Sequence, residues 1–299
     1  MSYVFTVIIP HKDSLSLLRR CVASIPLQED IQLIIVDDDS NVSEAEWNEF
    51  YTENSHVELY LTHEGRGAGY ARNVGLSHAI GTWVIFADAD DFFYPDAFLH
   101  LNKYIESDLD IIYFNSDGRD GVTLEKIGDR MPSIRQYIKD RNFNLLRYQS
   151  LVPWGKMIKR KVIEENQIRF DEVEVSNDVM FSIKLGYAVQ KIDVIDSTLY
   201  CCTANKDSLH FHQTISRVKT RIRIYKKACD FMYDHQLDEY RMPLSRGIWG
   251  YIKYLLPKHP FTFIWCIWTA RYKEHTKEYL KELCEIGKNW ITPIIHHQV

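Results

Sequence analysis

This 299-residue sequence has no long apolar run and no leader-like N-terminus. About 20 consecutive apolar residues are needed to span a bilayer, and no stretch reaches that length. Residues 1–13 (MSYVFTVIIPHKD) lack the basic start and long apolar core of a signal peptide and are typical of a β-strand. We therefore expect a cytoplasmic protein, with peripheral attachment to the inner face of a membrane left open.

Cysteine pairs at metal-binding spacing are also missing. The six cysteines form no C-x-x-C pair, and no histidine stands at a zinc-ligand spacing from them, which favours reduced, buried thiols. An excess of basic residues is missing too, because 36 Lys and Arg stand against 41 Asp and Glu, for a formal net charge of -5. Dedicated nucleic-acid-binding proteins are usually basic, so no nucleic-acid partner is expected.

What the sequence does have is a regular alternation of strand-like and helix-like segments in its first 115 residues. Apolar runs typical of buried strands lie at residues 4–9, 31–36, 57–61, 82–87 and 109–114. Helical patterns or helix starts fill the gaps, at 14–25, from about 43, at 68–79 and from about 95. This alternation predicts an α/β fold, with a Rossmann-like, mostly parallel sheet covered by helices on both faces.

Beyond residue 115 the pattern is less regular. We expect a loop or small hairpin over 115–132, strands over 154–158 and 189–202, and helices over 161–166 and 178–186. From about Thr214 the sequence is of helical type, so we place a boundary there. The chain is then an α/β domain, residues 1–214, followed by a C-terminal helical region, residues 215–299.

Two acidic clusters follow predicted strands, where such sheets bind ligands. In Asp88–Asp91 (Asp-Ala-Asp-Asp), three crowded carboxylates stay ionised more easily beside a cation. Mg²⁺ or Mn²⁺ prefers carboxylate oxygens together with substrate phosphates, so a metal–diphosphate site is predicted, with a solvated acidic turn as the alternative. The earlier cluster, Asp37–Ser40 (Asp-Asp-Asp-Ser), suits hydrogen bonding to a base or ribose, or helix N-capping by Asp39 or Ser40.

Two further motifs are less specific. The glycines of Gly65–Asn73 are similar to a dinucleotide-binding fingerprint, but Tyr70 replaces the third glycine and the stretch follows the third strand, which disfavours NAD binding. Arg72, near a predicted helix N-terminus, suits a diphosphate, although a surface arginine explains it equally well. Asn177 and Asp178 open a short helix, where Asp178 is either a general base or an N-terminal helix charge.

Four motifs in this order, IIPHKD, IIVDDDS, GYARNVGL and FADADD, resemble glycosyltransferase family 2, whose members have the GT-A fold. The usual forms are a turn like Pro-Thr-Tyr-Asn, then Val-Asp-Asp-Gly-Ser, Ala-Arg-Asn and Asp-x-Asp-Asp. Segments that begin at Trp154 and Asn177 also resemble the acceptor-side region of the family. The resemblance covers about residues 3–215, and four motifs in the correct order are far more specific than any one alone.

The resemblance implies a nucleotide-sugar half at about 1–115 and an acceptor half at about 116–214. In the first half, Pro10, His11 and Asp13 would line the nucleotide pocket, Asp38 would contact a uracil, Arg72 would hold the nucleotide, Asp88 would face the ribose, and Asp90 and Asp91 would hold the metal on the diphosphate. In the second half, Asp178 would be the catalytic base, with Trp154 and Asn177 on the acceptor side.

The activity that the resemblance implies is inverting transfer of a hexosyl or N-acetylhexosaminyl group, dependent on Mn²⁺ or Mg²⁺. The donor would be a nucleotide-diphosphate sugar, with a UDP-sugar as the first choice. The acceptor would be a saccharide or a lipid-linked saccharide, as in the biosynthesis of bacterial polysaccharides and the cell envelope.

Two departures from the family pattern bear on this expectation. Asn177 replaces the usual Glu of a Glu-Asp pair, while Asp178 keeps the carboxylate that takes the proton. His11 and Lys12 replace the common Thr-Tyr, which puts those base contacts in question. A catalytically weak or inactive nucleotide-sugar-binding relative therefore stays open, as does a metal-dependent phosphohydrolase, for which no nucleophile motif is visible.

The C-terminal region combines basic and aromatic residues. Residues 215–227 carry six basic and no acidic side chains, and an apolar helical stripe consists of Val218, Ile222, Tyr225 and Cys229. Aromatic residues cluster further on, at Phe261, Phe263, Trp265 and Trp268. This combination suits a membrane interface. Packing of a helical subdomain on the catalytic domain explains it slightly better.

Overall fold

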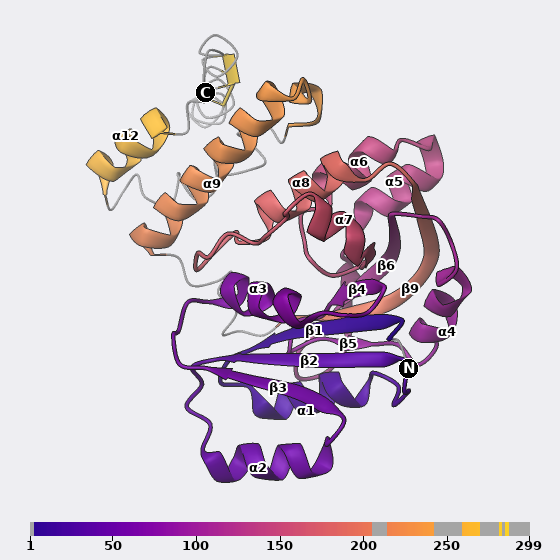
Figure 1. The fold of residues 1–299 in the computed structure, drawn as a ribbon. Coiled ribbons are helices and arrows are strands. Elements are labelled where there is room, and N and C mark those ends of the chain that lie inside the picture. Colours follow the sequence, from indigo (N-terminus) through magenta and orange to yellow (C-terminus); the bar gives the residue numbers. More distant parts are fainter. Residues whose placement is uncertain (1–2, 205–213, 242–258, 270–280, 283–284, 287–299) are drawn as a thin grey trace. The chain divides into compact units, whose positions relative to one another are not determined.

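The computed structural model describes residues 3–204, 214–241, 259–269, 281–282 and 285–286 (Figure 1). The chain divides into two compact units, residues 1–208 and 209–299. The boundary expected from the sequence, near residue 214, falls just after this division.

The first unit contains, within its described residues, a nine-stranded sheet. Its strands are β1 Phe5–His11, β2 Ile31–Asp38, β3 Val57–Thr62, β4 Trp83–Phe86, β5 Phe92–Phe93, β6 Ile111–Asp120, β7 Lys126–Asp129, β8 Lys156–Lys159 and β9 Ile192–Ala204. Its helices are α1 Leu15–Ala23, α2 Glu44–Glu53, α3 Ala68–His78, α4 Ala97–Leu101, α5 Pro132–Asp140, α6 Phe143–Gln149, α7 Arg160–Glu165 and α8 Val179–Ala188, with a 3-10 turn η1 at Asn102–Tyr104.

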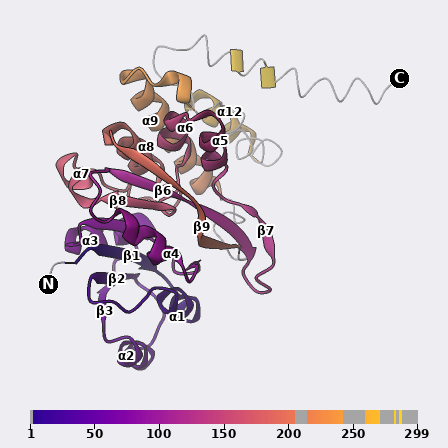
Figure 2. The same ribbon diagram turned by 90° about the vertical axis from the view of Figure 1, so that its right-hand side faces the viewer.

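The strands lie in the order β3-β2-β1-β4-β8-β6-β9-β5, and β7 pairs with β6. The first four are parallel, as the alternating pattern predicts, and β8 runs antiparallel between β4 and β6. Figure 2 shows the long strands β6 and β9 side by side, where they pair in parallel. Because β1 lies between β2 and β4, the strand order reverses there. The carboxyl ends of these three strands meet at one edge, where α/β sheets bind ligands.

Helices cover both faces of this sheet (Figure 1). On one face α1, α2 and α4 pack through residues such as Leu18, Trp47 and Phe98. On the other face α3 and α5 to α8 pack through residues such as Ala71 and Leu146. Strands β1, β2 and β4 are buried along their whole length, which explains why they are continuous apolar runs without alternation.

The strands and helices expected in the first 115 residues are present, with small shifts at their ends. Ser43 begins α2 in a capping box with Glu46, as expected. Further on, β6 extends to Asp120 and pairs with β7, so the polar stretch after residue 115 contains a hairpin. The short helices α5 and α6 were not expected from the sequence; α5 buries Ile134 and Tyr137, and α6 buries Leu146 and Tyr148.

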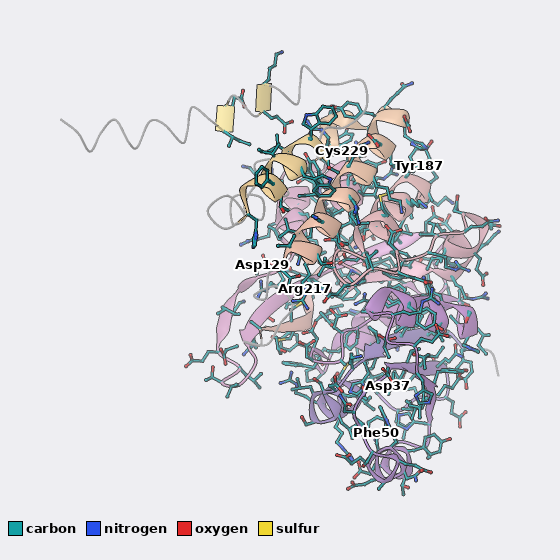
Figure 3. The ribbon with its side chains drawn as sticks, turned by 90° about the vertical axis from the view of Figure 1, so that its left-hand side faces the viewer. Asp37, Phe50, Asp129, Tyr187, Arg217 and Cys229 are labelled. Atoms are coloured by element: carbon teal, nitrogen blue, oxygen red, sulfur yellow. The ribbon has the colours of Figure 1, made fainter. Side chains whose placement is uncertain are left out.

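The second unit is described for α9 Ile215–Asp234, a 3-10 turn η2 at Asp238–Tyr240, α12 Pro260–Thr269 and two short pieces. The predicted stripe of α9 is buried, at Val218, Ile222, Tyr225 and Cys229 (Cys229 is labelled in Figure 3). Lys219 and Arg223 of α9 stack on the ring of Trp265 in α12, with their charged groups 5.1 and 5.6 Å from its centroid. The helices in the described ranges include none long and apolar enough to cross a membrane.

The cysteines whose side chains are described are free, buried thiols, as expected from their spacing: Cys21, Cys201, Cys202 and Cys229. Burial raises the pKa of Cys201 to about 11 and of Cys229 to about 12, so these thiols stay protonated at neutral pH. The side chains of Cys266 and Cys284 lie outside the described part of the chain.

Candidate active site

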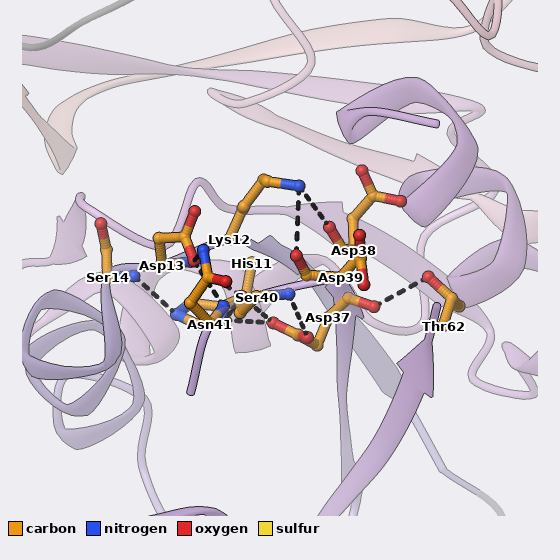
Figure 4. Close-up of polar contacts among 10 residues, drawn as sticks. All are labelled: His11, Lys12, Asp13, Ser14, Asp37, Asp38, Asp39, Ser40, Asn41 and Thr62. Atoms are coloured by element: carbon orange, nitrogen blue, oxygen red, sulfur yellow. Dashed lines mark hydrogen bonds and ion pairs between the residues drawn. The ribbon is translucent and has the colours of Figure 1, made fainter. Parts of the chain in front are cut away.

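Polar side chains join the carboxyl ends of β1 and β2 (Figure 4). His11 ends β1 and is 2% exposed; its Nδ1 lies 2.7 Å from Asp37, and its Nε2 accepts the backbone N–H of Ser14 at 3.1 Å. Because Nε2 is an acceptor, Nδ1 carries the proton and donates to Asp37. Burial works to raise the pKa of Asp37, but hydrogen bonds from His11 and Ser40 hold it below its ordinary value. His11 therefore fastens β1 to β2.

The loops that follow β1 and β2 are tied to each other. Lys12 donates to the backbone carbonyls of Asp38 and Asp39, at 2.9 and 3.2 Å. Asp13 accepts the backbone N–H of Asn41 at 2.7 Å. Asp13 and Asp39 have φ angles of 56° and 63°, a left-handed conformation that costs energy for residues other than glycine. Such a conformation persists only where surrounding contacts stabilise it, so the conformation of these two loops is fixed by the fold.

The residues expected around the nucleotide differ in exposure. Pro10 is buried inside β1 in register with Val36, and His11 is buried behind it, whereas Asp13 is exposed. Asp13 is the most exposed of the three, and the roles of Pro10 and His11 at the nucleotide stay predictions. Neither Asp39 nor Ser40 caps α2, because its N-cap is Ser43; the capping alternative considered from the sequence is wrong.

Asp38 links the end of β2 to the start of α3. Its two carboxylate oxygens accept the backbone N–H groups of Arg66 and Gly67, at 3.0 and 2.6 Å. Gly67 is the N-cap of α3 and has a φ of 89°, which favours glycine at this position. A carboxylate is stabilised at a helix N-terminus, and each oxygen keeps a second lone pair that a ligand can use.

Arg72 lies in the second turn of α3 and is 5% exposed, so it is not a surface arginine. Its guanidinium donates to Asp88 at 2.6 Å and to Asn177 at 2.9 Å. It also stacks on the ring of Phe170, 5.4 Å from the centroid. Arg72 thereby connects three separate segments: α3, the end of β4 and the loop before α8.

The acidic turn after β4 is held in place by β9. Asp91 is 3% exposed, and its carboxylate accepts hydrogen bonds from the Tyr200 hydroxyl at 2.9 Å and the Thr203 N–H at 2.7 Å. The Tyr200 hydroxyl also accepts the Asp88 N–H at 2.8 Å, and the Thr203 hydroxyl donates to the Asp90 carbonyl at 2.6 Å. The turn is thus a fixed element with one buried carboxylate, and not a solvated loop.

The acidic turn offers some, but not all, of the ligands that a divalent cation needs. Burial, together with the charges of Asp90 and Asp88, raises the pKa of Asp91 well above its ordinary value, and a cation would relieve this repulsion. Among the residues that the structure describes, no group of three or more His, Cys, Asp and Glu is arranged to hold a metal. Mg²⁺ commonly uses one or two carboxylates plus phosphate oxygens, so the donor set fits a cation that is bound together with a diphosphate.

Asp178, the residue expected on the acceptor side, is the N-cap residue of α8. Within the described part of the chain its side chain makes no capping hydrogen bond, and the helix-charge alternative, which needs none, stays open. Burial raises the pKa of Asp178, Arg72 lowers it, and Asp88 raises it further. Asn177, the residue before Asp178, accepts a hydrogen bond from Arg72, which also binds Asp88, so Asp178 lies near both groups. A carboxyl with a raised pKa is suited to accept a proton near neutral pH.

Trp154 lies in the loop before β8 and stacks on Tyr200, with ring centroids 5.8 Å apart and an interplanar angle of 23°. The tyrosine that holds the acidic turn therefore also supports the tryptophan expected on the acceptor side. Gly155 follows with a φ of 71°, in the left-handed region that favours glycine.

Four residues of this region were missed in the sequence. Tyr200 and Thr203 lie in a long strand whose pattern is that of ordinary β-structure, and nothing local marks them. Arg20 of α1 donates to the Asp90 carbonyl and to the Thr203 hydroxyl, and its signal is only that of a surface helix. Lys156 has a usable signal, because a charge stands at the start of a buried strand.

The comparison with protein families agrees with this geometry. The family model described as Glycosyl transferase family 2 matches residues 6–166, more than half of the chain. The chain belongs to glycosyltransferase family 2. Glycosyltransferase GlyA of Streptococcus pneumoniae is 27% identical to this family 2 chain over 219 residues, which are 68% of this chain and 31% of GlyA. The chain therefore spans about a third of the length of that relative.

Solved structures share the fold of this family 2 chain. Staphylococcus aureus TarS 1–349 in complex with UDP-GlcNAc has a TM-score of 0.68 and 18% identity, with 90% of this chain and 82% of that chain covered. The mannosyltransferase PcManGT from Pyrobaculum calidifontis, in complex with GDP-Man and Mn²⁺, has a TM-score of 0.53 and 16% identity, with 98% and 81% covered. The family 2 chain therefore has the GT-A fold with a helical C-terminal region.

Proposed function

We propose that this protein transfers a sugar, with inversion, from a UDP-sugar to a saccharide or lipid-linked saccharide, with Mn²⁺ or Mg²⁺ as cofactor. The observation that carries the proposal is the position of Arg72, which binds Asp88 of the acidic turn and Asn177 beside Asp178. The buried guanidinium of Arg72 thus lies between the acidic turn, where the donor would bind, and Asp178, the proposed base. The TarS structure with UDP-GlcNAc and the PcManGT structure with GDP-Man and Mn²⁺ support a nucleotide-sugar donor.

The resemblance assigns the cation to Asp90 and Asp91, but Asp91 is buried and its oxygens are engaged by Tyr200 and Thr203. On the donor side, Asp90 and Asp88 would therefore hold the cation together with diphosphate oxygens. When bound, the cation supplies charge that stabilises the departing diphosphate. Arg72 contributes a second positive charge at the same place. Its Nε–H is buried and has no hydrogen-bond partner among the described residues, so the guanidinium keeps a donor for a phosphate oxygen. Asp38 and Asp13 stand at the neighbouring strand ends, where the nucleoside would lie.

On the acceptor side, Asp178 accepts the proton of the acceptor hydroxyl as its oxygen attacks the anomeric carbon. Attack comes from the face opposite the diphosphate, so an α-linked donor gives a β-linked product. Arg72 stabilises the negative charge that grows on the leaving diphosphate. Asn177 has no charge to offer the acceptor, but its oxygen holds Arg72 in place.

The test is a panel of UDP-glucose, UDP-GlcNAc and GDP-mannose, each with Mn²⁺, with Mg²⁺ and with EDTA. We expect metal-dependent release of UDP from a UDP-sugar, slowly to water and faster to an added acceptor, and NMR of the product should show an inverted anomeric centre. Nucleotide binding without any release would favour the inactive relative. Free inorganic phosphate in place of UDP would favour the phosphohydrolase.

We further propose that the second unit contacts an anionic membrane surface, on the cytoplasmic side. Phe261, Ile264 and Trp268 of α12 are 87%, 58% and 69% exposed, and α9 carries the basic stretch. Packing of these helices on the catalytic domain remains the alternative.

The double variant Phe261→Ser/Trp268→Ser should lose flotation with liposomes that contain phosphatidylglycerol. Leu99→Ser, at a residue of the first unit that is 63% exposed, is the matched control. Equal flotation of all three proteins would discard the membrane contact.

A further inference from the structure

A lysine is buried in the acceptor half. Lys156 is the first residue of β8 and is 1% exposed. Its ammonium donates to the backbone carbonyl of Ser150 at 2.8 Å and to that of Val152, and it lies 5.9 Å from the centroid of the Tyr113 ring. Lysine is almost never fully buried without a partner, because the desolvation of its charge is costly. The two carbonyls are the partners that offset this cost.

Both carbonyls belong to the loop of residues 150–155, which connects α6 to β8. Helix α8 holds the same loop from another direction, because the Ser182 hydroxyl donates to the Leu151 carbonyl at 2.9 Å. Ser182 lies one turn after Asp178 and donates its own N–H to the Asp178 carbonyl at 2.9 Å. Three consecutive loop carbonyls therefore bind Lys156 or α8. The loop is attached directly to the helical turn that begins with Asp178.

Lys156 and Asp178 also affect each other electrostatically. Burial lowers the pKa of Lys156 to about 7, and the charge of Asp178 opposes that shift. Lys156 is in turn one of the positive groups, after Arg72, that lower the pKa of Asp178 against the effect of burial. The Lys156 ammonium is buried against the Tyr113 ring, whereas the Asp178 residue is partly buried.

We propose that Lys156 is a positioning residue that holds the 150–155 loop, and with it Trp154, in register with Asp178. The ammonium keeps the loop carbonyls turned inward, so that Trp154 stacks on Tyr200. Its charge favours the ionised carboxylate of Asp178. The consequence for catalysis rests on the proposed function, whereas the attachment of the loop does not.

The first test needs no activity. Lys156→Met keeps the length of the side chain and removes the charge and both hydrogen bonds. The matched control is Lys159→Met, on the same strand, where the ammonium donates to the Ser107 carbonyl at 2.9 Å and lies 4.2 Å from the centroid of the Trp83 ring. Hydrogen exchange of the full chain, followed by mass spectrometry, should be faster in Lys156→Met over residues 150–155 and 178–185. Exchange over residues 31–38 should be unchanged in Lys156→Met. Exchange over residues 150–155 should be unchanged in Lys159→Met.

The second test separates positioning from general damage. Calorimetry should show that Lys156→Met retains the binding of UDP with Mn²⁺. The rate of UDP release, measured with whichever UDP-sugar the wild-type protein uses, should fall on the order of tenfold to a hundredfold. A small displacement of groups at the reacting centre lowers the rate by such factors. The acid limb of its pH profile should move to higher pH, since a charge that lowers the pKa of Asp178 is gone.

Each result has a distinct meaning. Unchanged exchange over 150–155 in Lys156→Met would overturn the proposal, and so would an acid limb that stays in place or a loss of UDP binding as large as the loss of rate. A wild-type protein that releases no UDP from any donor would overturn the proposed function instead. The exchange experiment would still decide whether Lys156 holds the loop.

Discussion

The hydroxyl of Tyr200 donates a 2.9 Å hydrogen bond to the carboxylate of Asp91, a residue 109 positions earlier in the chain. The second oxygen of the same carboxylate accepts the N–H of Thr203. Both contacts come from β9, so the last described strand of the first unit shapes the acidic turn. Within that turn, Asp91 is engaged in supporting the fold, whereas Asp90, beside it, is only partly buried.

This difference predicts distinct effects of two neighbouring substitutions. Asp91→Asn should lower the melting temperature, because its amide N–H would face the Thr203 N–H or the Tyr200 hydroxyl and leave a buried group without an acceptor, which costs about 1–3 kcal/mol and outweighs the relief of charge repulsion in the turn. Asp90→Asn should leave the melting temperature near that of the wild type and weaken the Mn²⁺-dependent binding of UDP in calorimetry. Tyr200→Phe is the control and should resemble Asp91→Asn. If both Asp variants lost the Mn²⁺-dependent binding of UDP and had the same melting temperature, Asp91 would be a metal ligand rather than a residue that supports the fold.

Asp178→Asn tests the proposed base. General base catalysis contributes typically 10²–10⁴-fold, so kcat for transfer should fall by about that factor. The binding of UDP with Mn²⁺ should be retained, because Asp178 lies on the acceptor side. Steady-state kinetics and calorimetry on the same preparation check both statements. Turnover equal to the wild type would remove Asp178 from the mechanism.

The pH dependence of the wild-type protein follows from the raised pKa of Asp178. The base acts in its ionised form, so activity should rise with pH as Asp178 loses its proton, and the midpoint of that rise should lie above the ordinary carboxyl range. Measured rates of transfer across a pH series check this.

The raised pKa of Asp178 also affects the stability of the fold. A carboxyl whose pKa is raised by folding lowers stability as the pH rises from its ordinary pKa to the raised one, and the loss is complete above the raised pKa. Asp178→Asn should therefore gain stability relative to the wild type above that pH, in denaturant titrations at several pH values, and an equal difference at all pH values would count against this burial.

Gly69 tests the attachment of the acceptor side to α3. A Cβ at this position would lie 2.2 Å from the Asp171 carbonyl oxygen and 2.9 Å from the Cβ of Asn177. Gly69→Ala should push the 171–177 segment away from α3 and lower stability by about 1–3 kcal/mol, with a loss of transfer activity. Ser77→Ala, on an exposed position of the same helix, should change neither. Chemical denaturation and donor turnover are the measurements, and a stable, active Gly69→Ala protein would contradict this packing.

The sequence by itself was sufficient for the class of fold and for the sheet edge at which the candidate site lies. Strands buried on both faces must be continuous apolar runs, and their alternation with helices leads to parallel neighbours. The order of four motifs then indicated the family. Since the carboxyl ends of parallel strands share one edge, Asp38 and Asp88 were expected on the same side of the sheet, and α3 does connect them through Gly67 and Arg72.

The tertiary structure alone decided what each acidic and basic group does there. Whether Asp90 or Asp91 is buried depends on Tyr200 and Thr203, and no local pattern reports a partner more than a hundred residues away. The same holds for Arg72, whose partners lie in two other segments, and for Lys156, whose charge is matched by loop carbonyls. Side-chain environments arise from contacts between distant segments, whereas the periodicity of a sequence reports only which face of a local element is apolar.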